Sequence, residues 1–147
     1  MLCFFVAALG AKMSKMYMDR KFQISVRSNF AELWRYNIVV MCGTFNAQGE
    51  QLSVTTSQSK SADTDSQDSS DDAQARSVKL VTEPCDSIKA YIYLMPHKLP
   101  SAQTPDDAPD FNIRVKVKAA DEELYNVIHK VNQWSGATIE LRLPKSE

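Results

Sequence analysis

Glycine is scarce in this chain of 147 residues, and its scarcity removes two classes of ligand site. The four glycines lie well apart: Gly10, Gly43, Gly49 and Gly136. A GxGxxG dinucleotide loop and a phosphate loop of the GxxxxGKS/T type both need glycines close together, so the sequence has neither. No nucleotide cofactor is therefore expected.

Histidine is equally rare, because only His97 and His129 occur, 32 positions apart. The HExxH pattern of metalloproteases is absent. Cys42 is a weak candidate for a nucleophile, since no local signature surrounds it and those two histidines are the only bases of their kind. We do not expect an enzyme.

Long apolar runs and an excess of one charge are also missing. No apolar stretch reaches the ~18 residues that a spanning helix requires, and the formal net charge is −1. The chain therefore lacks the overall positive field that draws proteins to nucleic acid.

The N-terminal twelve residues, MLCFFVAALGAK, form a short apolar run with three interpretations. Its length and small residues resemble the core of a secretory signal, although no positive region precedes it. Alternatively, translation starts at Met13, Met16 or Met18, or the run is a core strand. We treat residues 1–20 as an apolar leader or flexible segment. Membrane contact is expected only through it, and export is favoured if residues 1–11 are a signal remnant.

Most of the remaining chain has the two-residue period of half-buried strands. The predicted strands are 21–27, 37–45, 51–56, 77–82, 88–95, 112–118 and 137–143. The run 37–45 is almost continuously apolar, which predicts a central strand covered on both faces. Residues 46–49 predict a hairpin turn in which Gly49 has positive φ.

Residues 121–134 fit two patterns. Leu124, Val127, Ile128 and Val131 have helical spacing, and Gly136 could end such a helix. The same segment alternates from Tyr125 to Val131 as a return strand, and its β-branched and aromatic content favours the strand. A short helix near 121–134 stays open as the alternative.

The composition changes abruptly at residues 57–76. The window 57–75 has six serines, five aspartates and no apolar residue larger than alanine. Such a segment cannot bury enough surface to offset its ordering entropy, so we predict a disordered acidic loop. Its deletion should leave folding intact.

Seven or eight strands without a strand–helix–strand alternation argue against a parallel sheet. We predict a mainly β fold, an antiparallel two-sheet β-sandwich of immunoglobulin-like architecture, formed by a single domain over residues 21–147. Architecture of this kind does not by itself imply a function.

Two cysteines remain once Cys3 is set aside in the leader. A Cys42–Cys85 disulfide would close a loop of about 43 residues and stabilise the fold by ~4 kcal/mol on the chain-entropy model. The alternative is a buried free thiol at Cys42 that packs as a small hydrophobic residue.

Aspartates in the predicted loops give a weak candidate for a calcium site. The match to an EF-hand fails, because Asp68 stands where glycine is needed and Gln74 where glutamate is needed. A looser site at one end of the sandwich would combine the loop aspartates Asp63, Asp65, Asp68, Asp106, Asp107 and Asp110.

The predicted strand 112–118 points Arg114, Lys116 and Lys118 to one side. These side chains could bind phosphate groups, with Tyr91 and Tyr93 as stacking surfaces. Alternating lysines more often form a solvated face or protect a sheet edge, so nucleic acid is not the expected partner.

The function that these patterns favour is a non-enzymatic protein–protein interaction module, acting at a sheet edge or a loop end. The alternative is an exported sandwich that binds calcium, or an acidic membrane surface through calcium, by its loop aspartates. The sequence leaves the partner's identity and the oligomeric state open.

Overall fold

The computed structural model describes residues 20–59, 77–101 and 107–144, and these ranges are dominated by β-strands. A single 3-10 turn, η1 (Leu33–Arg35), precedes β2. The strands are β1 (Phe22–Arg27), β2 (Tyr36–Phe45), β3 (Gln51–Gln58), β4 (Val78–Val81), β5 (Ser87–Pro96), β6 (Phe111–Ala119), β7 (Glu122–Val131) and β8 (Ala137–Leu143). Within the described ranges, no helix is long and apolar enough to cross a membrane.

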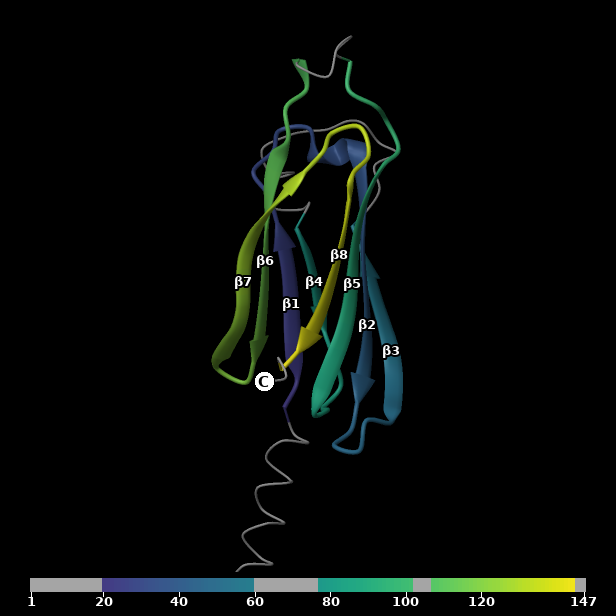
Figure 1. The fold of residues 1–147 in the computed structure, drawn as a ribbon, viewed down its shortest axis with the longest axis vertical. Coiled ribbons are helices and arrows are strands. Elements are labelled where there is room, and N and C mark those ends of the chain that lie inside the picture. The colour runs from purple at the N-terminus through teal and green to yellow at the C-terminus, as the bar shows by residue number, and fades with distance from the viewer. Residues whose placement is uncertain (1–19, 60–76, 102–106, 145–147) are drawn as a thin grey trace, which may run out of the picture.

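The eight strands form two antiparallel four-stranded sheets (Figure 1). The first sheet has the order β4-β1-β6-β7 and the second the order β3-β2-β5-β8. The predicted two-sheet sandwich is confirmed. The finer description, immunoglobulin-like, is not confirmed: β1 and β2 lie in opposite sheets, whereas the first two strands of an immunoglobulin constant domain share one.

The core lies between the sheets and is made by alternate residues of almost every strand. Phe22, Ile24 and Val26 of β1 face it from the first sheet, and Ile38 and Val40 of β2 from the second. All five side chains are buried. Because the strand period is two, their sequence neighbours are carried to the outer faces, and this decides which polar residues can meet a ligand.

The helical interpretation of residues 121–134 is wrong, because β7 pairs antiparallel with β6 over Glu122–Val131. A tight turn joins the two strands, with Ala120 at φ 56°. The helical spacing did not mark a buried face: Val127 is 40% exposed and Ile128 is 52% exposed. The segment forms a strand because β6 supplies backbone hydrogen-bond partners along its whole length.

Other predictions need smaller corrections. β2 is central, but only one of its faces is covered by described residues, since Met41 on the outer face is 38% exposed. β3 runs through Ser57 and Gln58, two residues into the predicted acidic loop. The remainder of that loop, residues 60–76, and the predicted leader up to residue 19 lie outside the described residues. The hairpin with Gly49 at φ 84° is confirmed.

Candidate binding face

The outer face of the first sheet carries a concentration of positive side chains. Its outward positions follow from the buried alternation of β1, β4 and β6 and from their register. The basic residues there are Arg27 of β1, Lys79 of β4, Arg114, Lys116 and Lys118 of β6, and Lys130 of β7. We call these six residues the basic face. Glu123, on the edge strand β7 opposite Lys118, is the acidic residue among these outward positions.

Register places like charges against one another on this face. Arg27 lies directly opposite Arg114 in the β1–β6 ladder. Like charges at directly opposed positions destabilise an antiparallel pair. The Nη1 of Arg114 donates to Asn126 Oδ1 over 2.6 Å, and this bond neutralises neither charge. The repulsion between Arg27 and Arg114 therefore destabilises the fold, and an anion bound on this face would offset it.

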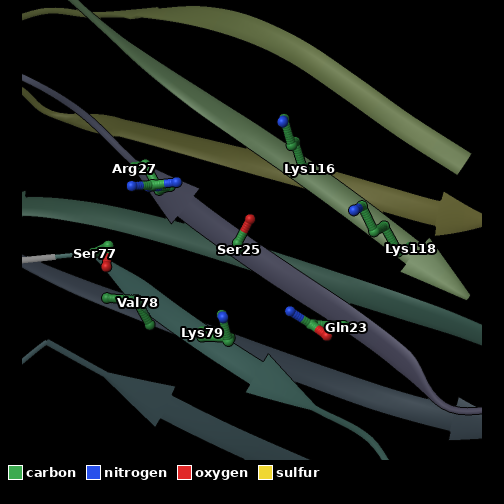
Figure 2. A pocket seen from close by; sticks show the side chains of 8 residues that line it. All are labelled: Gln23, Ser25, Arg27, Ser77, Val78, Lys79, Lys116 and Lys118. Atoms are coloured by element: carbon green, nitrogen blue, oxygen red, sulfur yellow. The ribbon is translucent and has the colours of Figure 1, made fainter. Parts of the chain in front are cut away.

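Neutral residues separate the lysines of the neighbouring strands. Ser25 pairs with Lys79 on one side and with Lys116 on the other, and Gln23 pairs with Lys118. Figure 2 shows the consequence: β1 runs between β4 and β6, with the lysines on either side of its small polar residues. Among the described residues, no carboxylate forms an ion pair with Lys79, Lys116 or Lys118.

Two hollows follow this face. The first, of about 480 Å³, is lined by Gln23, Ser25, Arg27, Ser77, Val78, Lys79, Lys116 and Lys118. The second, of about 600 Å³, lies against Arg27, Ser28, Asn29, Asn112, Ile113, Arg114, Lys116 and Ile128. Arg27 and Lys116 line both, so the two hollows adjoin. An anionic ligand could occupy one or both.

The predicted combination of basic strand and tyrosines does not form. Tyr91 and Tyr93 project from β5 in the other sheet, on the outer side of the sandwich away from the basic face. Their rings are nearly parallel, with centroids 6.3 Å apart. Lys89 Nζ lies 5.4 Å from the Tyr91 ring centroid and 4.0 Å from a Glu140 carboxylate oxygen. That face is thus mixed in charge and partly apolar.

The two cysteines named as a candidate disulfide are both free and both completely buried. Burial, and then the neighbouring Cys85, raise the pKa of Cys42 to about 12. Burial also raises the pKa of Cys85. Neither thiol ionises near neutral pH, which is unfavourable for a nucleophile. The Cys42–Cys85 disulfide stays a prediction.

Most residues of the predicted calcium site lie outside the residues that the structure describes. Asp63, Asp65, Asp68 and Asp106 lie outside the described residues, whereas Asp107 and Asp110 are exposed just before β6. Within the described ranges, no group of three or more His, Cys, Asp or Glu side chains is placed to hold a metal ion. Calcium binding therefore also stays a prediction.

The two histidines occupy separate places, and in the part of the chain that the structure describes neither is hydrogen-bonded to a cysteine. His97 Nε2 lies 2.8 Å from the Trp34 carbonyl oxygen. His129 Nε2 lies 2.9 Å from the Tyr125 hydroxyl, and burial lowers the pKa of His129. The His97 bond joins residues 63 positions apart, and the His129 bond joins two residues of β7.

Sequence reasoning identified half of the basic face. It named Arg114, Lys116 and Lys118 but not Arg27, Lys79 or Lys130, which join them from other strands. The alternation predicts outward positions for Arg27 and Lys79, and for Lys130 only if residues 121–134 are a strand, yet nothing in the sequence shows that β1 separates β4 from β6. The strand order of the first sheet brings Arg27, Lys79 and Lys130 onto the same face as the three residues of β6.

Comparisons with known proteins add no activity. No protein-family model matches the sequence, and no curated protein matches it. A DUF4425 family protein from Bacteroides ovatus is similar in structure, with 8% identity and a TM-score of 0.45 over 87% of this chain and 97% of its own. A domain of unknown function, DUF4425, from Bacteroides vulgatus is similar over 86% and 95%, with 8% identity and a TM-score of 0.42. Neither description mentions a ligand.

Proposed function

We propose that the protein is a non-enzymatic interaction module that binds an acidic partner protein on its basic face. The observation that carries the proposal is the separation of charge. The face has six positive side chains and one negative, whereas the whole chain has a net charge of −1. Six of the 17 lysines and arginines thus share one sheet surface of a weakly acidic protein. Complementary charge of this kind steers association and fixes orientation.

The opposed arginines support a binding role over a purely structural one. Arg27 and Arg114 face each other across adjacent strands, where a polar or oppositely charged pair would be more stable. Alternating lysines alone would suit an exposed edge that must resist aggregation. However, β1 and β6 are the two inner strands of their sheet, so their backbones need no such protection.

The chemistry of the remaining candidates favours binding over catalysis. Cys42 is a buried thiol of raised pKa, and His129 is held against Tyr125. A nucleophile needs an adjacent base and access to substrate, and within the described ranges no hydrogen bond joins these two groups. The sheet edges predicted as binding sites are present, and β7 is the longest edge strand. Its edge lacks the charge concentration of the face beside it.

The test is the affinity of the full chain for fluorescently labelled poly-L-glutamate at low and moderate salt. Replacing Lys116 and Lys118 by glutamine should weaken binding about fivefold, the effect of two partly exposed ion pairs. The matched control replaces Lys98 and Arg142, which lie away from the basic face, by glutamine. This control should change the affinity for poly-L-glutamate less than twofold. Equal losses in both double variants, or no binding at all, would contradict the proposal.

A further inference from the structure

The basic face is shaped as well as charged, and its shape restricts the form of the partner. The half-buried Ser25 and Gln23 of β1 form a floor. Lys79 of β4 stands on one side of that floor, and Lys116 and Lys118 of β6 stand on the other (Figure 2). We call this arrangement the basic trough. It runs parallel to the strands and continues past Arg27 into the second hollow.

The positive charges repeat along the trough with the period of an extended chain. Arg114, Lys116 and Lys118 are alternate residues of β6, so their backbone positions are about 6.8 Å apart. An extended peptide repeats its same-side side chains at the same distance. Carboxylates at every second residue of such a peptide would meet these three cations in turn. An α-helix repeats its same-face side chains at a shorter interval, about 5.4 to 6.0 Å, and falls out of step with the three cations.

The floor suits a peptide backbone. Ser25 and Gln23 carry a hydroxyl and an amide, which can donate to and accept from main-chain groups. A bulkier residue at position 25 would fill the space between Lys79 and Lys116. The small polar floor thus leaves room for a chain between the two rows of charge.

The same lining is poorly suited to single-stranded nucleic acid. Proteins that bind it combine positive charge with aromatic rings on which bases stack. None of the residues that line the two hollows is aromatic. Tyr91 and Tyr93, whose rings are stacked, belong to the other sheet.

From these observations we infer that the basic trough binds an extended acidic segment of a partner protein, with carboxylates at alternate residues, lying along β1 and β6. This inference rests on the proposed function, because it requires the basic face to be the binding surface. It adds the conformation of the ligand and the spacing of its charges.

The experiment compares two labelled twelve-residue peptides of identical composition on the full chain. In one, glutamate and threonine alternate; in the other, pairs of glutamates alternate with pairs of threonines, so that no two carboxylates lie two residues apart. We expect the alternating peptide to bind about fivefold more tightly. The Lys116→Gln, Lys118→Gln double variant should abolish that preference.

A second variant blocks the trough without changing charge. Ser25→Phe should weaken the alternating peptide at least fivefold, and Thr138→Phe, on the exposed outer face of β8, should not. Thermal unfolding of both variants shows whether they fold as the parent does. If Ser25→Phe fails to fold, Ser25→Leu provides the same steric test with a smaller side chain.

The outcomes separate the two proposals. If both peptides bind equally and both are weakened by the lysine substitutions, the basic face is the binding surface and the inference about an extended segment is wrong. If neither peptide binds, both proposals fall. The same assay is run with a twelve-nucleotide oligo-dT and with vesicles rich in phosphatidylserine. If either binds more tightly than the peptides, and the Lys116 and Lys118 substitutions weaken that binding equally, the ligand is a phosphate-bearing molecule and the inference of a peptide ligand is wrong.

Discussion

Arg35 and Gln133, 98 positions apart in the chain, are joined inside the protein by a hydrogen bond of 2.5 Å from Arg35 Nη2 to Gln133 Oε1. Both residues are buried, at 2% and 7% exposure. The same guanidinium donates to Glu32 Oε1 and to the Lys98 carbonyl, and Gln133 donates through Nε2 to the Pro109 carbonyl. The Arg35 side chain thereby connects the turn before β2 to the loops that follow β5 and β7.

We expect Gln133→Ala to destabilise the fold by roughly 3 kcal/mol, because it leaves a buried guanidinium N–H and the Pro109 carbonyl without partners. Denaturant unfolding measures the change. Glu32→Ala is the control: its carboxylate pairs with the same guanidinium, but its side chain is 52% exposed, so the loss should stay below about 1 kcal/mol. Equal effects would show that burial does not set the strength of this network.

Gly136 meets a second constraint at the same end of the sandwich. Its φ is +77°, and a Cβ built there would lie 1.9 Å from the Leu94 carbonyl oxygen. Gly136→Ala should therefore cost more than about 2 kcal/mol, since backbone must move. Gly49→Ala separates the two causes, because Gly49 has φ +84° but open space around it. It should cost only ~1 kcal/mol. A mild Gly136 variant in thermal unfolding would contradict the clash.

The buried Cys42 thiol should make the protein sensitive to alkali. Its pKa rises from 9.0 to about 12 on folding, so above pH 9 the unfolded chain releases a proton that the folded chain retains. Stability then falls as pH rises from 9 towards 12, by at most about 1.4 kcal/mol per pH unit. Cys42→Ala should unfold with a shallower dependence in that window. The slopes are compared because the cavity left by the smaller side chain costs the same at every pH.

Thiol labelling provides an independent check on the same residue. Both Cys42 and Cys85 should react slowly in the folded chain and rapidly in denaturant, because both are fully buried. Rapid labelling of Cys42 under native conditions would contradict its placement in the core. Absence of labelling at both residues in denaturant without reductant would instead indicate the predicted disulfide.

Deleting the acidic segment tests where the strand ends. Removal of residues 61–75 should leave cooperative unfolding intact, because Ser57 Oγ already donates to the Lys79 carbonyl over 3.2 Å and the two strands can be joined by a short connection. Removal of residues 57–75 should be more harmful. It takes away Ser57, Gln58 and Ser59, and the Ser59 amide donates to the Ile38 carbonyl over 2.9 Å. Equal thermal midpoints for the two deletions would show that the end of β3 contributes nothing.

The local pattern was sufficient to predict seven of the strands and their inward faces. In Asn112–Lys118 each apolar residue is followed by a charged one, and a strand is the conformation that separates the two sets. Positive φ at Gly49 was predictable because a tight hairpin requires it. The segment 121–134 was harder, because helical and strand periods both fitted it and the decision depended on β6, a partner outside the segment.

Two features were not predictable from any local pattern. Gln133 has no neighbour in sequence that marks it as the buried partner of Arg35. The exposure of Met41 depends on what covers β2, and the apolar run 37–45 was consistent with a strand covered on both faces. In each case the deciding contact joins residues that are distant in the chain.

By itself the sequence determined seven of the strands, their two faces and the side to which the lysines of those strands point, because these depend on a repeat of two residues along the chain. Only the tertiary structure decided that β1 lies between β4 and β6, that Arg27 opposes Arg114, and that Tyr91 and Tyr93 lie on the other side of the sandwich. Strand order is fixed by packing between distant segments and by how the connections cross from one sheet to the other. The binding face depends on that order, because its charges come from four strands.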